Sequence, residues 1–139
     1  MGNRRKAREM ALQTLYQSEL SGNTAADAFD IFCSNFETNK KAVAYARELI
    51  YGVTGELSTI NAMIESYSAN WRMSRMSVID RNILRLATFE MCISPQPVPA
   101  SVVINEALEV ARRYSSDDSI PFINGILDAM RKKMEAKEA

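Results

Sequence analysis

A dense basic segment near the N-terminus is the most distinctive chemical feature of this sequence. Arg4, Arg5, Lys6 and Arg8 place four positive charges within five positions, in a chain of 139 residues whose 17 Lys and Arg balance 17 Asp and Glu. On a helix, Arg4 and Arg8 share one face, with Arg5 beside them. Guanidinium groups arranged in this way can bind phosphates or stack on unpaired bases. Because basic residues at a helix N-terminus oppose the helix dipole, the segment modestly favours RNA binding over a merely solvated helix start.

No residue set in the sequence resembles a catalytic or metal-binding site. Histidine is absent, so imidazole can serve neither as a general base nor as a metal ligand. The sequence also lacks glycine-rich phosphate loops, a nucleophile elbow and a calcium-binding loop. The acidic residues at positions predicted to be solvated helix surfaces are Glu9, Glu48, Glu65, Glu90, Glu106 and Glu109. We therefore expect no catalytic residue, no metal and no cofactor, and predict that the chain is not an enzyme.

The composition predicts one folded domain spanning residues 1–139. The chain is 47% hydrophobic and 24% charged, which is typical of globular proteins, and its size allows a core without disulfides or metals. Zero net charge argues against a nucleic-acid binder that uses its whole surface, but not against a local basic patch. No stretch approaches the roughly 18 apolar residues of a membrane span. Two isolated cysteines, Cys33 and Cys92, without a signal peptide predict a reducing, cytoplasmic location.

Apolar residues recur at helical spacing along almost the whole chain, whereas the alternation typical of strands is nearly absent. The sequence therefore predicts an all-α domain of six or seven helices. Gly22 ends the first of them, and a bend or break is expected between Gly52 and Glu56. Pro95–Pro99 predicts an extended connector. The apolar stripes cover residues 7–16, 25–36, 43–53, 57–67, 79–92, 103–111 and 122–134.

Polar residues predict where the later helices begin. Ser77 is expected to cap a helix with Asp80 at its third position. This helix is apolar around much of its circumference, which predicts a place at the centre of the bundle. Residues 114–118 read as a loop, and Ser119 is expected to cap the last helix, with a proline in the first turn. Whether the charged tail from Arg131 to Ala139 is ordered stays open.

Four segments, taken in order, resemble the NusB family of bacterial transcription antitermination factors. They are Arg4–Gln17 (RRKARE and ALQTLYQ), Asp80–Met91 (DRNILRLATFEM), Pro99–Glu109 (with VVINEALE) and Phe122–Asp128 (FINGILD). No single segment is decisive, but their ordered combination spans almost the whole chain and is quite specific. The resemblance implies an all-helical fold of about seven helices in two packed sub-bundles.

The same resemblance implies assembly rather than catalysis. NusB-like proteins bind the boxA sequence of nascent RNA, especially in ribosomal RNA leaders, together with NusE, a small ribosomal subunit protein that doubles as a transcription factor. The pair joins elongating RNA polymerase with other Nus factors and suppresses premature termination. Single-stranded RNA offers splayed bases for stacking and hydrogen bonding, and its phosphates make the affinity depend on salt.

The family pattern assigns RNA binding to two parts of the chain. Arg4, Arg5 and Arg8 are expected to hold phosphates. The loop before the last helix and the residues that open that helix complete the RNA surface, which here brings in Asp118 and Phe122. Phe122 can act as a stacking ring, and core packing is its alternative.

NusE is expected to dock on another face. The family pattern points there to Tyr16 on the first helix and Asp80 on the central helix. For Tyr16, core packing is again the alternative.

Departures from the family pattern remove positive charge from the expected RNA side. Pro121 and the pair Ala100–Ser101 stand where similar proteins often carry basic residues, and Tyr114–Ser115 replaces a common Phe-Gly. Arg112 and Arg113 could compensate. We expect RNA affinity to be weaker than in similar proteins, or to depend more on NusE.

Two other functions stay open. NusB-like domains also form the RNA-binding part of certain RNA cytosine methyltransferases, but that activity requires a βαβ nucleotide-binding domain, and this sequence has no such pattern. The second alternative is a helical protein-interaction module that has lost RNA binding, for which the zero net charge leaves room. Some family members pair as homodimers that hide the RNA surface. The sequence decides neither the oligomeric state nor the preferred boxA variant.

Overall fold

The computed structural model describes residues 2–35, 39–69 and 71–138. Phe36, Thr38, Asn70 and Ala139, which belong to the predicted second stripe, two predicted connections and the tail, lie outside the described residues. Among the described residues every regular element is a helix, so the predicted all-α class is confirmed. The elements are α1 (Gly2–Ser21), α2 (Ala25–Asn35), α3 (Lys40–Gly55), α4 (Leu57–Tyr67), a 3-10 turn η1 (Met73–Arg75), α5 (Val78–Thr88), a π-helical turn η2 (Phe89–Ile93), α6 (Ala100–Tyr114) and α7 (Ser119–Glu138).

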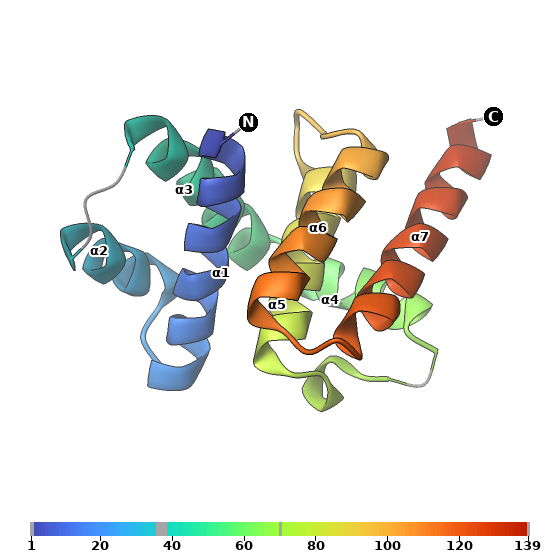
Figure 1. Cartoon of the computed structure of the whole chain (residues 1–139), viewed down its shortest axis with the longest axis horizontal. Coiled ribbons are helices and arrows are strands. Elements are labelled where there is room, and N and C mark those ends of the chain that lie inside the picture. The colour runs from blue at the N-terminus through green and yellow to red at the C-terminus, as the bar shows by residue number, and fades with distance from the viewer. Residues whose placement is uncertain (1, 36–38, 70, 139) are drawn as a thin grey trace.

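The helices form two sub-bundles that share α5 as their common support (Figure 1). Helices α1, α2 and α3 pack on one another, and α4, α6 and α7 surround α5 on the other side. Because α5 also contacts α1 and α3, it lies at the centre of the molecule, as its apolar circumference predicts. None of the described helices is long and apolar enough to cross a lipid bilayer.

Side-chain caps set the starts of α5, as the sequence predicts for Ser77, and of α3. The Ser77 hydroxyl accepts a hydrogen bond from the Asp80 backbone N–H at 3.1 Å, and Oδ1 of Asn39 accepts one from the Lys41 N–H at 2.8 Å. Each cap satisfies a backbone donor that has no partner within the helix. The predicted break after Gly52 falls at Glu56, where α3 ends and α4 begins.

Helix α7 differs from its prediction at its first residue, and its C-terminal part answers a question that the sequence leaves open. Ser119 is the first residue of the helix rather than its cap, and its hydroxyl donates to the carboxylate of Asp80. The charged tail from Arg131 onward continues the helix through Glu138. Ion pairs between Asp128 and both Arg131 and Lys132 support this last part at helical spacing.

The π-helical turn η2 brings a large ring against α3. The backbone N–H of Ser94 donates to the carbonyl of Phe89 at 2.8 Å, five residues earlier. The Phe89 ring lies directly over Gly52 of α3, so closely that a Cβ atom at Gly52 would overlap it. Glycine is therefore required here for close approach between the two sub-bundles.

We predict that Gly52→Ala lowers the free energy of unfolding by about 1–3 kcal/mol, because the added methyl forces the buried Phe89 ring out of place. Gly55→Ala is the matched control: a Cβ there meets nothing within 4 Å, so its effect should be neutral or stabilising by up to about 1 kcal/mol. Urea denaturation of both variants measures the difference. Equal stabilities would contradict the packing described.

Candidate nucleic-acid and partner interface

A buried ion pair lies beneath the basic segment and joins the two sub-bundles. Arg8 of α1 donates from Nε and Nη2 to the two carboxylate oxygens of Glu90 in η2, at 2.7 and 2.8 Å. Arg8 is 7% exposed and Glu90 is 2% exposed. The prediction that Glu90 lies on a solvated surface is therefore wrong. The physical reason is its spacing, since Glu90 follows Ile83 by seven positions and continues the buried stripe of that helix.

Two further groups complete this buried cluster. The Tyr45 hydroxyl donates to Glu90 at 2.5 Å, and Nη1 of Arg8 donates to Glu106 at 3.2 Å. Burial opposes the charge of Arg8, but the hydrogen bonds and charge of Glu90 outweigh it and raise the pKa of Arg8. Burial and the bond to Glu90 likewise raise the pKa of Tyr45. Arg8 therefore keeps its charge and Tyr45 its phenol proton at neutral pH.

The other two predicted arginines stay at the surface. Arg5 donates from Nε and Nη2 to Glu106 at 3.1 and 2.6 Å, and this bond holds the pKa of the Glu106 carboxyl below its usual range. The guanidinium carbon of Arg4 lies 4.5 Å from the centre of the Tyr45 ring, a cation–π distance. Arg4 and Arg5 are therefore accessible, whereas all three nitrogens of Arg8 bind carboxylates inside the protein.

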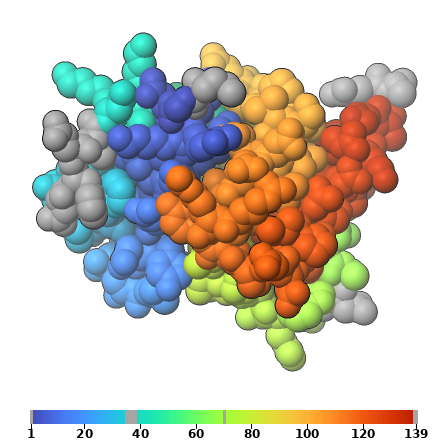
Figure 2. Space-filling view, in the orientation of Figure 1, coloured from blue at the N-terminus to red at the C-terminus, as the bar shows by residue number. Residues whose placement is uncertain are grey.

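Side chains of α1 and α6 meet along a polar seam, and Figure 2 shows the atoms of the two helices abutting on this face. Three links between α1 and α6 make up this seam. Arg5 binds Glu106, Arg113 pairs with Glu9, and Nε2 of Gln13 donates to the hydroxyl of Tyr114 at 3.3 Å. We call these residues the α1–α6 seam; it comprises Arg5, Glu9, Gln13, Glu106, Arg113 and Tyr114.

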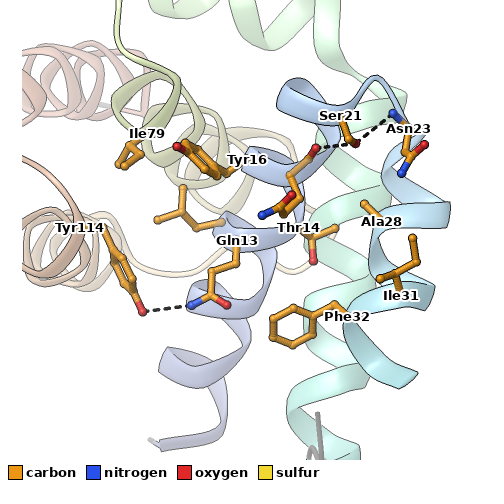
Figure 3. Close-up of a pocket in the computed structure, with 12 residues that line it drawn as sticks. Gln13, Thr14, Tyr16, Ser21, Asn23, Ala28, Ile31, Phe32, Ile79 and Tyr114 are labelled. Atoms are coloured by element: carbon orange, nitrogen blue, oxygen red, sulfur yellow. Dashed lines mark hydrogen bonds between the residues drawn. The ribbon is translucent and has the colours of Figure 1, made fainter. Parts of the chain in front are cut away.

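A groove of about 540 Å³ opens at the lower end of the seam. Residues of α1 form the middle of the groove. Ile31 and Phe32 of α2 line one side, and Ile79 and Tyr114 line the other (Figure 3). Tyr16 is half-buried and lines this groove. Its ring is therefore accessible from the groove, and Tyr16 is not among the described residues that pack against the hydrophobic core.

A buried hydroxyl also belongs to the groove lining. Thr14 is 1% exposed, and its Oγ1 has no hydrogen-bond partner among the described residues. A buried polar atom without a partner is uncommon, because it forgoes the hydrogen bonds that water would provide.

Asp80 has a different environment from the one expected of a residue that binds a partner. It is 8% exposed, and its two carboxylate oxygens accept hydrogen bonds from the hydroxyls of Ser115 and Ser119. These bonds tie the loop between α6 and α7 to the start of α5. Asp118 lies exposed in that loop.

Phe122 lies beside an aromatic residue that the sequence prediction did not include. Its ring meets Trp71 edge to face, with centroids 6.0 Å apart and planes at 66°. Trp71 is 52% exposed, whereas Phe122 is half-buried against the core. In the sequence, the single tryptophan followed by Arg72 and Arg75 is the signal that could have indicated this surface.

The described residues contain no group of three Cys, Asp or Glu side chains arranged to hold a metal ion. Burial raises the pKa of the thiols of Cys33 and Cys92, which disfavours the reactive thiolate. The charged side chains instead bind one another and line surfaces. Fold and site thus define a two-part helical bundle with a basic edge, a polar seam and an adjoining groove.

Comparison with known proteins assigns this helical bundle to a family. The chain matches the sequence profile of the NusB family over residues 5–132, and it belongs to that family. Two curated relatives are the transcription antitermination proteins NusB of Desulfotalea psychrophila, 46% identical over 94% of this chain and 96% of the relative, and of Myxococcus xanthus, 46% identical over 92% and 94%.

Solved structures share the fold. NusB of T. maritima superposes with a TM-score of 0.83 at 36% identity, covering 93% of this chain and 90% of the other. A structure of the antitermination factors NusB and NusE in complex with dsRNA gives a TM-score of 0.81 at 27% identity, covering 96% and 98%. The expected arrangement in two packed sub-bundles is confirmed.

We predict that Glu90→Gln lowers the free energy of unfolding by about 3–5 kcal/mol, because it leaves the buried guanidinium of Arg8 without its counter-charge. Glu135→Gln removes a carboxylate from an exposed pair with Arg131, and such pairs contribute only about 0–1 kcal/mol. Chemical denaturation of both variants measures the difference. Similar decreases in the two would show that Glu90 is not the buried counter-charge described.

Proposed function

We propose that this chain is a transcription antitermination factor that binds boxA-containing RNA together with NusE and joins the elongating RNA polymerase complex, especially on ribosomal RNA operons. The observation that carries the proposal is its likeness, over 96% of its length, to the NusB solved with NusE and dsRNA. The role is non-catalytic, and it places the protein with nascent transcripts in the cytoplasm.

The first part of the RNA surface is the start of α1. Arg4 and Arg5 are exposed there, and their guanidinium groups can bind phosphates bidentately. Arg8 supports RNA binding indirectly, because its bonds to Glu90 and Glu106 hold this end of α1 against the rest of the molecule. Affinity should therefore depend on salt, as it does wherever phosphates are neutralised.

The second part of the RNA surface is the loop before α7 with the first turn of that helix. Asp118 is exposed and can accept hydrogen bonds from bases. The ring of Phe122 presents an edge beside the exposed Trp71. Two neighbouring aromatic rings can stack unpaired bases, and such stacking supports single-strand binding.

NusE is proposed to dock over the groove beside Tyr16. The ring of Tyr16 supplies apolar area with a polar tip, which is typical of residues that dominate protein interfaces. Asp80 supports this surface from beneath, because it fixes the loop between α6 and α7 at the edge of the groove.

The RNA role of the first part predicts that Arg4→Gln/Arg5→Gln weakens boxA RNA binding by roughly three- to tenfold and reduces its salt dependence, because two groups that neutralise phosphates are removed. Fluorescence anisotropy with boxA-like and scrambled RNAs, with and without NusE at two salt concentrations, measures this. Arg131→Gln/Lys132→Gln removes the same charge from α7, and should leave binding nearly unchanged. If neither RNA binds even with NusE present, the protein is a protein-interaction module instead.

The partner role predicts that Tyr16→Ala weakens NusE binding by roughly tenfold or more, because truncating a central aromatic residue removes much of an interface's binding energy. Tyr51→Ala is the matched control, since Tyr51 is an exposed tyrosine on α3 outside the groove lining. Calorimetric titration with NusE measures both affinities. Unchanged affinity in Tyr16→Ala would place the NusE surface elsewhere.

A further inference from the structure

Three arginines surround a small cleft in the outer part of the α1–α6 seam. The cleft has a volume of about 220 Å³ and is lined by Arg5, Arg112, Arg113, Glu9, Glu109 and Val110. Arg5 comes from α1 and the other two arginines from α6, so residues about a hundred positions apart meet here. Arg5 and Arg113 line the same cleft, and the pKa of Arg113 is raised chiefly by its bond to Glu9, while the charge of Arg5 opposes this rise.

The positive groups in this cleft lie further out than the negative ones. The side chains of Arg5 and Arg113 are 49% and 66% exposed, whereas their partners Glu106 and Glu9 are 15% and 17% exposed. Only Glu109, at 50%, is as exposed as its partner Arg112. An approaching polyanion therefore meets guanidinium groups first, although the seam contains as many acids as bases.

The guanidinium groups of α6 also keep free donors. Among the described residues, Arg112 and Arg113 each make an ion pair through Nη1 alone, to Glu109 and Glu9. Their Nε–H and Nη2 groups can thus donate to another acceptor. A phosphate carries several acceptor oxygens and accepts from such forks bidentately.

The cleft lies between the two parts of the proposed RNA surface. Arg5 marks the upper end of the α1–α6 seam, and the bond between Gln13 and Tyr114 marks its lower end. Tyr114 is followed directly by the loop that holds Asp118 and leads to Phe122. The seam therefore joins the two parts, and an RNA strand that follows it passes over the cleft.

We propose that Arg5, Arg112 and Arg113 form a phosphate-binding cleft that holds the RNA backbone between the N-terminal arm and the loop before α7. This site rests on the proposed RNA-binding function and adds to it two arginines of α6. They replace the positive charge that is missing at Ala100–Ser101 and Pro121. Glu109 is the opposing group, because its exposed carboxylate repels the incoming phosphate.

The test measures boxA RNA binding in the presence of NusE for Arg112→Gln/Arg113→Gln across a range of salt concentrations. Glutamine keeps helix propensity, and circular dichroism with thermal unfolding checks that the fold is retained. We expect affinity to fall roughly three- to tenfold. The slope of log affinity against log salt should shrink by about 0.7 for each phosphate of the single-stranded RNA that the variant no longer neutralises. Glu109→Gln should act in the opposite direction and tighten binding.

The control is Arg131→Gln/Lys132→Gln, which removes equal charge from α7, on the other side of α6 from α1 (Figure 1). If Arg112→Gln/Arg113→Gln binds no worse than this control, or keeps the full salt slope, the cleft proposal is overturned while RNA binding by the unaltered chain stands. If the unaltered chain itself binds no RNA with NusE present, both the cleft and the proposed function are overturned.

Discussion

The pairing of Arg8 with Glu90 is the constraint on which the rest of this surface depends. A charge buried without a partner is far more costly than a buried pair whose hydrogen bonds are complete. Helix α1 can therefore dock on η2 only in the register that brings these two side chains together. That register also brings Phe89, the residue before Glu90, over Gly52 of α3. The ion pair between Arg8 and Glu90 and the absence of a side chain at Gly52 thus set how the two sub-bundles meet.

Fixing α1 in this register determines what it presents to solvent. Arg4 and Arg5 lie about one turn before Arg8, so Arg4 emerges over Tyr45 of α3 and Arg5 emerges beside Glu106 of α6. Further along, Glu9 and Gln13 reach Arg113 and Tyr114. Buried or half-buried carboxylates thus hold guanidinium groups that point outward. A chain with no net charge presents a basic edge in this way, because Glu106 and Glu9 lie deeper here than their partners Arg5 and Arg113.

Much of the fold could be predicted from sequence because helix boundaries are local. Ser77 and Asn39 cap helices through bonds that span two or three residues, and such short spacings can be recognised in the sequence. The central place of α5 follows from its own composition. The bonds of Ser119 and Ser115 to Asp80 span 39 and 35 positions, and no local pattern indicates them. The same is true of the π-helical turn, which depends on how Phe89 packs against another helix.

The basic arm shows where charge patterns in sequence stop being informative. Helical spacing predicts that Arg4 and Arg8 share one face. Charge alone does not show which arginine points inward, because a buried and an exposed arginine carry the same charge. The partner that buries Arg8 lies 82 positions away in the sequence. The distinguishing signal was apolar spacing: Ala11 and Leu15 follow Arg8 by three and seven positions, and both are buried. Glu90 follows Ala87 and Ile83 at the same spacings, and both of those are buried as well. One arginine and one glutamate, each inside an apolar stripe of a different helix, together predict a buried pair, because neither charge can be buried alone.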